Sequence, residues 1–288
     1  MILPFTDPAC QDVGVAGGKG ASLAVATARG LPVPPGYVVC SSAFEEAVGV
    51  RAEELRELAR ASDCEGAMAL VGELPRPDLG ETFAALGAAT VAVRSSAVAE
   101  DSDAASFAGQ QETYLGVPDA ATAADRVVDC WASFFSERAL FYRARKGSLD
   151  DLRMAVVIQE MVAADVAGIL FTIDPVARRR DQMVVEAVFG LGEPAVSGAL
   201  TPDNYTMARD GRVKKRRIST QPWALVGGEE VVLSPEDGAR ETLSDDQLAA
   251  LAELGRTLEE HNGSPQDIEW AFAGGELYVL QSRPVTTQ

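Results

Sequence analysis

The chain of 288 residues is long enough to bury a substantial core, either as one large domain or as two lobes. Its composition, 47% hydrophobic and 24% charged, is that of a soluble globular protein. The net charge of −18 argues against nucleic acid or an anionic membrane surface as the main partner, although a local basic pocket can still bind a nucleotide.

The sequence shows no targeting or membrane segment. No apolar run approaches the roughly 18 residues that suggest a transmembrane helix. The N-terminus lacks the basic and apolar regions of a signal peptide. The four cysteines, at positions 10, 40, 64 and 130, have no C-x-x-C spacing, which favours reduced thiols over disulfides or zinc ligands. We therefore expect a cytoplasmic protein.

The first candidate site is the glycine-rich stretch around Lys19, with glycines at positions 14, 17, 18 and 20. It precedes a helix expected over residues 21–28. Backbone N–H groups at a helix start, together with a lysine, favour phosphate binding. The stretch is not a Walker A loop, because Val13 and Gly20 stand where that loop needs Gly and Ser or Thr. A plain turn with an exposed lysine explains the stretch equally well.

Two further candidates lie at the ends of apolar strands. Residues 90–93 predict a strand that runs into Arg94, and an arginine at a strand end can make bidentate phosphate contacts. The loop of small residues 106–111, which includes Gly109, could fold over phosphates. The strand expected over 154–158 opens into residues 159–162, where apolar side chains and backbone groups suit an adenine ring.

The middle of the chain alternates helices and strands. We expect one long helix over 120–146 with an aromatic core stripe, strands over 166–173 and 183–188, and a helix over 248–260. Gly190–Ala195 matches G-x-G-x-x-A, but Pro194 argues against a following helix, so we reject a dinucleotide site. The basic run 213–218 is typical of a solvated strand edge. The pattern predicts mixed α and β structure in two lobes.

The only histidine, His261, follows a helix in the context Glu260-His261-Asn262-Gly263. A favourable interaction with the helix end explains it better than catalysis. A Ser/His/Asp triad would have to use this residue, which argues against hydrolase chemistry of that class.

The last candidate is a hairpin expected on either side of Gly274-Gly275. Asp267 and Glu269 are two residues apart on one strand, and Gln281 and Arg283 are two apart on the other, so each pair shares a face. Carboxylates and an amide oxygen suit a hard cation, and arginine binds phosphate oxygens. On this stretch alone, a metal–phosphate site and an ordinary solvated hairpin face are both open.

Six segments in order together resemble the N-terminal ATP-binding domain of the phosphoenolpyruvate synthase and pyruvate phosphate dikinase family, which includes rifampicin phosphotransferase. They are GGKGASLA (17–24), LPVPPGY (31–37), VRSSAVAEDSDAASFAGQQETYL (93–115), GILFTIDP (168–175), EAVFGLGEPAVSGALTPDNY (186–205) and PQDIEWAFAGGELYVLQSRP (265–284). Any one could arise by chance, but six in family order across nearly the whole chain are specific.

The resemblance implies an ATP-grasp fold of mixed α/β (α+β) class, with two lobes and the nucleotide cleft between them. We expect the N-terminal lobe over residues 1–157 and the C-terminal lobe over 158–288. The implied roles are phosphate binding by Lys19 and Arg94, a phosphate cover with Gly109 and Thr113, an adenine hinge of Gln159, Glu160, Met161 and Val162, an acidic active-site position at Asp267, magnesium ligands Glu269 and Gln281, and a neighbouring arginine, Arg283.

The family's enzymes also carry a mobile domain with a phospho-accepting histidine, and a third domain for the acceptor. His261 lies where the family has no carrier histidine. We therefore expect a phosphoryl or pyrophosphoryl group to pass from MgATP to a histidine on a separate chain or domain, with AMP and phosphate as products. The small-molecule acceptor is not specified by the sequence. Residues 45–90 are shorter than the family's, which puts acceptor or partner contacts there in doubt.

Two alternatives stay open. The chain could be a stand-alone ATP-dependent kinase or ligase that acts directly on a small molecule, or a catalytically silent nucleotide-binding regulatory subunit. The presence of all the expected phosphate and metal side chains argues against the silent subunit.

Overall fold

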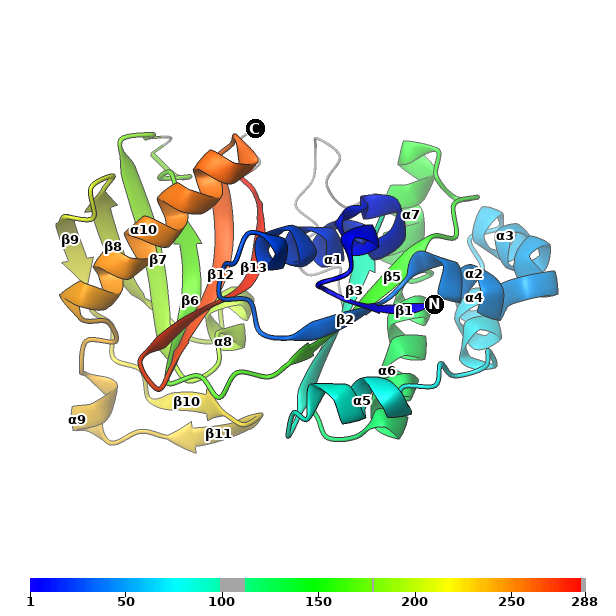
Figure 1. Ribbon diagram of the computed structural model, residues 1–288, viewed down its shortest axis with the longest axis horizontal. Coiled ribbons are helices and arrows are strands. Elements are labelled where there is room, and N and C mark those ends of the chain that lie inside the picture. Colours follow the sequence, from blue (N-terminus) through cyan, green and yellow to red (C-terminus); the bar gives the residue numbers. More distant parts are fainter. Residues whose placement is uncertain (99–111, 178, 286–288) are drawn as a thin grey trace. The chain divides into compact units, whose positions relative to one another are not determined.

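The computed structural model describes residues 1–98, 112–177 and 179–285, and it divides the chain into two compact units (Figure 1). Unit 1 comprises Met1–Gly30 and Pro35–Met161, and unit 2 comprises Leu31–Pro34 and Val162–Gln288. The expected lobe boundary after residue 157 falls inside a strand, Met154–Glu160, shortly before this division. Over the described ranges, no helix is both long enough and apolar enough to cross a membrane.

Unit 1 is built on a five-stranded sheet in the order β1-β2-β5-β3-β4, in which every neighbouring pair is antiparallel. The strands are β1 (Ile2–Pro4), β2 (Gly36–Val39), β3 (Val91–Ala97), β4 (Thr113–Val117) and β5 (Met154–Glu160). The helices are α1 (Val13–Ala28), α2 (Ser41–Val48), α3 (Ala52–Arg60), α4 (Cys64–Gly72), α5 (Gly80–Leu86), α6 (Ala120–Ser133) and α7 (Glu137–Lys146), with 3₁₀ turns at Pro8–Gln11 and Gly49–Arg51.

The two faces of this sheet have different roles. Alternate strand residues, among them Val93 of β3 and Val156 and Ile158 of β5, point into an apolar core formed with α2, α3, α4 and α6. The opposite face carries α1, whose Gly20 lies against Val38 and Val157. Both faces of the sheet are therefore covered, one by the apolar core and the other by α1.

The helix expected over 120–146 is in fact two helices, α6 and α7, so that prediction was wrong. Ser136 ends the continuity because its side chain caps α7 by accepting a hydrogen bond from the Ala139 N–H group, at 3.4 Å. The core prediction for its aromatic residues is correct for Trp131 and Phe135, which are fully buried, whereas Phe141 is exposed.

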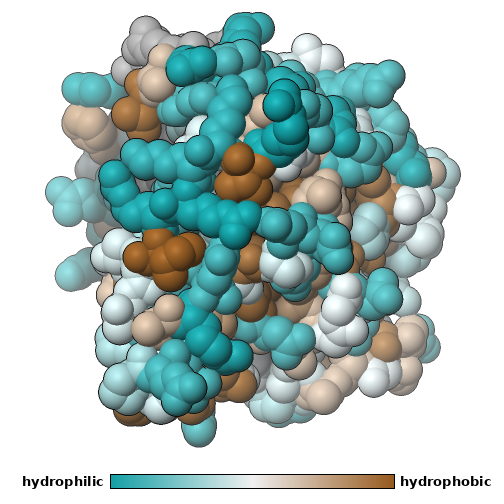
Figure 2. Space-filling model, turned by 90° about the vertical axis from the view of Figure 1, so that its left-hand side faces the viewer, coloured by the Kyte–Doolittle hydropathy of each residue, from teal (hydrophilic) through white to brown (hydrophobic). Residues whose placement is uncertain are grey.

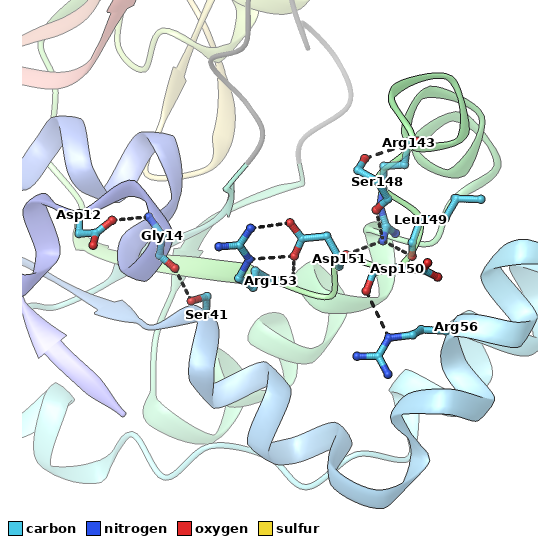
Figure 3. Close-up of polar contacts among 10 residues, drawn as sticks. All are labelled: Asp12, Gly14, Ser41, Arg56, Arg143, Ser148, Leu149, Asp150, Asp151 and Arg153. Atoms are coloured by element: carbon cyan, nitrogen blue, oxygen red, sulfur yellow. Dashed lines mark hydrogen bonds and ion pairs between the residues drawn. The ribbon is translucent and has the colours of Figure 1, made fainter.

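A buried arginine fixes the loop after α7 (Figure 3). The guanidinium of Arg143 donates to the carbonyl oxygens of Phe134, Leu149 and Asp151 at 3.2, 3.0 and 2.6 Å. Its Cζ atom lies 3.8 Å from the ring centroid of Phe134. Burial lowers the pKa of Arg143 to about 10, so the side chain still carries its charge at neutral pH.

Unit 2 is built on a six-stranded antiparallel sheet in the order β13-β12-β6-β7-β8-β9. Its strands are β6 (Val166–Phe171), β7 (Gln182–Phe189), β8 (Asp203–Ala208), β9 (Val213–Arg217), β12 (Gln266–Ala273) and β13 (Glu276–Pro284). A separate hairpin consists of β10 (Trp223–Val226) and β11 (Glu229–Val232), and the helices are α8 (Glu193–Ser197), α9 (Pro235–Gly238) and α10 (Asp245–Asn262).

One face of the six-stranded sheet forms the core of unit 2. The apolar stripe of α10 packs on Leu170, Val185, Tyr205, Ile268 and Trp270, all fully buried. Leu31 and Val33 pack against the same cluster, and the Val279 N–H group donates to the Pro32 carbonyl at 2.9 Å. The four residues 31–34 therefore belong to the core of unit 2, although the chain on both sides of them belongs to unit 1.

A buried carboxylate holds the loops around β8 in place. Asp203 is fully buried and accepts hydrogen bonds from the Ser219 N–H group at 2.8 Å and from the Thr242 N–H group and hydroxyl at 3.0 and 2.9 Å. Each of these donors compensates part of the cost of burying the carboxylate. The start of β8 is thereby fixed to two segments that lie far away in sequence.

The basic run forms edge strand β9, which confirms its interpretation as a solvated strand edge. Lys214 pairs with Asp181 at 3.5 Å and Arg216 with Glu241 at 3.2 Å. The end of unit 2 that carries β9 is predominantly hydrophilic, with scattered apolar side chains (Figure 2).

The expectation that no helix follows Gly192 was wrong. A short helix, α8, begins at Glu193, because proline is tolerated in the first turn of a helix, where its missing N–H group has no intrahelical partner. It ends after five residues at Gly198, which has a φ of 76°. Strands β7 and β8 on either side of it are antiparallel, so no βαβ unit forms, and the rejection of a dinucleotide fold is correct.

The Arg143 cluster gives a stability prediction. Arg143→Ala would leave several partly buried carbonyl oxygens without a donor, and we expect it to lower the free energy of unfolding by about 3 kcal/mol. Arg56→Ala is the matched control, because Arg56 reaches the same loop from its partly exposed position through one hydrogen bond, to the Asp150 carbonyl at 3.2 Å. Urea denaturation followed by circular dichroism measures the stability of both variants. Equal losses of unfolding free energy would contradict the conclusion that Arg143 fixes this loop.

Candidate functional site

The glycine-rich stretch was expected to form a loop before a helix. It lies instead within α1. The helix runs from Val13 to Ala28 and is interrupted at Gly17, which has φ 68° and ψ 174°. The Ser96 hydroxyl bridges the break: it accepts from the Gly20 N–H group at 3.1 Å and donates to the Ala16 carbonyl at 2.8 Å. The helix is in effect restarted after Gly17, with Lys19 in its new first turn.

Lys19 is buried, with 5% of its surface exposed, so the alternative of an exposed lysine on a plain turn is wrong. Its ammonium group donates to the Ser95 carbonyl at 3.0 Å. A buried lysine is uncommon and needs polar partners, and here the start of a helix lies beside it. This combination is suited to an anion, because the N–H groups and the macrodipole of the new helix start favour negative charge.

Arg94, Gln159 and Thr113 share one face of the unit 1 sheet. Arg94 pairs with Val157 on β5 and with Thr113 on β4, and Ala92, two residues earlier on β3, pairs with Gln159. Alternate strand residues project from the same face, so these side chains lie on the face that carries α1. Arg94 and Gln159 are 8% and 3% exposed. The structure therefore brings the unit 1 candidates together with Lys19.

The expected adenine hinge is partly used by unit 1 itself. The Glu160 N–H group donates to the Pro35 carbonyl at 2.9 Å, and the Met161 N–H group donates to the Thr90 carbonyl at 3.1 Å. Val162 is the first residue of the second part of unit 2. An adenine edge would have to contact other backbone groups of this segment. Gly109, the other expected loop residue, lies outside the described residues.

The expected hairpin is confirmed in detail. Strands β12 and β13 are joined by Gly274 and Gly275, whose φ values of 57° and 86° suit the two-residue turns that match strand twist. Asp267 lies opposite Arg283, and Glu269 lies opposite Gln281. The Arg283 guanidinium contacts Asp267 Oδ2 through Nε at 2.9 Å and through Nη2 at 2.8 Å.

Electrostatics distinguishes this face from an ordinary solvated hairpin. Burial raises the pKa of Asp267, the neighbouring Arg283 opposes the rise, and Glu269 adds to it. Gln281 is 5% exposed. The hairpin face therefore concentrates partly buried carboxylates around a single guanidinium, which is typical of a site for a cation or a cation-bound anion.

The donor set fits a magnesium ion. Glu269 and Gln281 lie directly opposite each other and supply carboxylate and amide oxygens, the ligands that hard cations prefer. Within the described part of the chain, no group of three or more His, Cys, Asp or Glu side chains is arranged to hold a metal by itself. Magnesium commonly binds through few protein oxygens and completes its shell with water and phosphates.

Sequence reasoning missed Glu186 on β7. Burial raises the pKa of Glu186, a hydrogen bond with Asn204 opposes the rise, and the Asp267 carboxylate adds to it. A single acid inside the apolar run Val184-Val185-Glu186-Ala187-Val188 was the available signal. His261 lies inside the last turn of α10 and not after the helix, which ends at Asn262 and is capped by Gly263 with a φ of 68°; its helix-end context is confirmed.

The comparisons with known proteins define the class of this domain. Residues 76–288 match the family described as pyruvate phosphate dikinase, AMP/ATP-binding domain. The match covers more than half of the chain, and the chain belongs to this family. It is therefore an AMP/ATP-binding domain of the pyruvate phosphate dikinase type.

Individual relatives extend the similarity to nearly the whole chain. It is 38% identical to the probable phosphoenolpyruvate synthase of Methanothermobacter thermautotrophicus over 98% of this chain and 46% of the relative. It is 42% identical to the rifampicin phosphotransferase of Streptomyces sviceus over 96% of this chain and 35% of the relative. It is 34% identical to the phosphoenolpyruvate synthase of Pyrococcus furiosus over 98% of this chain and 43% of the relative. The chain thus spans less than half the length of these relatives.

The break in α1 gives a second prediction. Gly17→Ala would place a Cβ atom 2.1 Å from the Ser96 carbonyl oxygen, in addition to the strain of a positive φ. Gly30→Ala is the matched control, because Gly30 has a φ of 73° but nothing within 4 Å of a built Cβ. We expect Gly30→Ala to cost about 1 kcal/mol and Gly17→Ala clearly more, measured as free energies of unfolding in urea. Equal costs would show that the contact with Ser96 is dispensable.

Proposed function

We propose that this chain is the MgATP-binding component of a dikinase-type phosphotransferase with an ATP-grasp fold. It would transfer a phosphoryl or pyrophosphoryl group from ATP to a histidine on a separate chain or domain, with AMP and phosphate as products. The observation that carries the proposal is the burial of Lys19 and Arg94 on one sheet face of an AMP/ATP-binding family domain. Buried cations of this kind are suited to the phosphates of a nucleotide.

The residues of unit 1 would bind and orient the nucleotide. Lys19 and Arg94 would neutralise charge that develops on the β- and γ-phosphates, and Thr113, on the same sheet face as Arg94, would support them together with Gly109. Gln159, Glu160, Met161 and Val162 would contact the adenine. Positioning and charge neutralisation are the main means of catalysis in phosphoryl transfer, because the protein forms few covalent bonds there.

The residues of unit 2 would hold the metal and complete the charge balance. Glu269 and Gln281 would bind magnesium, and Arg283 would contact phosphate oxygens while its bond to Asp267 fixes its orientation. Bound magnesium supplies electrostatic stabilisation of the phosphates. Asp267 would support the metal or a bound water molecule.

The names of the family and of its relatives suggest the acceptors to test. A stand-alone kinase or ligase would consume ATP when incubated by itself with pyruvate or rifampicin. The carrier mechanism requires AMP to form only when the histidine-bearing part of a phosphoenolpyruvate synthase is added as a separate chain. A silent regulatory subunit would bind ATP in calorimetry and form neither AMP nor ADP under any of these conditions.

Arg94→Ala and Glu269→Ala test the assignment. We expect each to lower AMP formation by about 100-fold or more, because each removes a group that acts on the charged phosphates or the metal, while circular dichroism shows a retained fold. Arg212→Ala and Glu229→Ala are the matched controls, since both side chains are exposed and lie on or beside strands of unit 2. Near-normal AMP formation by either site variant would overturn the site assignment.

A further inference from the structure

A row of side chains that is polar except for Ile169 extends beyond the hairpin across the six-stranded sheet. The strand register places Gln281 opposite Glu269, Glu269 opposite Ile169, Ile169 opposite Glu186, and Glu186 opposite Asn204. Residues directly opposite each other on neighbouring strands project from the same face. Glu186 and Asn204 therefore lie on the face of Glu269 and Gln281, away from the core under α10.

Charge on this face is unbalanced around Glu186. Asp267 and Glu269 share the face with it, Arg283 on this face pairs with Asp267, and the exposed Arg217 of β9 lies opposite Asn204. Glu186 is only partly exposed, and its carboxylate accepts a hydrogen bond from the Asn204 amide. Partial burial of a carboxylate beside other carboxylates is costly unless a cation binds nearby.

The spacing argues for contact through water rather than direct ligation. Glu186 and Glu269 are two strands apart, which separates their backbones by about 10 Å. In the described ranges no three acidic side chains come close enough to hold one metal directly. A magnesium ion keeps several of its water molecules, and these need acceptors in an outer shell.

We propose that Glu186, held by Asn204, is a positioning residue that accepts hydrogen bonds from the metal-bound water of MgATP and strengthens magnesium binding at this face. This inference rests on the proposed function. It predicts a dependence on metal that a purely structural role of Glu186 does not produce. Loss of its charge should weaken binding of MgATP, whereas metal-free ATP, which the carboxylate repels, should bind equally well or more tightly.

The test uses Glu186→Gln, which keeps the size of the side chain and its ability to hydrogen-bond Asn204. ATP is titrated into the 288-residue chain by calorimetry, once with magnesium chloride and once with a chelator. We expect about 10-fold weaker binding in magnesium and no loss in the chelator. Glu236→Gln is the matched control, because Glu236 is an exposed carboxylate of the short helix α9 and its loss removes the same charge.

The outcomes separate this inference from the proposed function. Equal weakening of Glu186→Gln under both conditions means that the residue is merely structural, and no change in either condition means that it is unconnected with the metal; both overturn the inference. Glu269→Gln is measured alongside. If Glu269→Gln loses affinity only in magnesium while Glu186→Gln matches the control, the proposed site stands and only this inference fails. If Glu269→Gln is also unaffected, the proposed metal pair itself is wrong.

Discussion

The constraint on which the candidate site depends is that each main sheet gives one face to a hydrophobic core. In unit 1 that face packs against α2, α3, α4 and α6, and in unit 2 it packs against α10. Because side chains alternate along a strand, burying one set delivers the intervening residues to the opposite face. A slip of one residue in register would move Arg94 or Glu269 into a core, so the packing of apolar residues fixes the placement of the charged ones.

Much of this arrangement could be predicted from local sequence. The hairpin of β12 and β13 follows from the alternation of residues around Gly274-Gly275, and the prediction that Asp267 and Glu269, and likewise Gln281 and Arg283, share a strand face is confirmed. The basic edge strand and the helix-end position of His261 also follow from local composition. These features depend on neighbours in the sequence, where turn chemistry and periodicity are strong signals.

What could not be predicted depends on contacts between distant residues. The break in α1 at Gly17 requires Ser96, which lies far away in sequence on strand β3, and the glycine-rich stretch alone predicted a loop. The burial of Lys19 depends on the same strand. Glu186 looks like one more residue of an apolar strand until sheet register places it in the row with Glu269. Local propensity contains no information on any of these pairings.

The placement of Leu31–Pro34 has a consequence for how the two units are connected. These residues complete the core of unit 2, yet they lie between α1 and β2 of unit 1, so the backbone passes from one unit to the other three times. A single proteolytic cut after Met161 would leave unit 2 missing a part of its core that stays covalently joined to unit 1. Neither unit can therefore be excised from the gene as one uninterrupted segment. A circular permutation or gene fusion that keeps both units intact has to keep residues 31–34 together with unit 2.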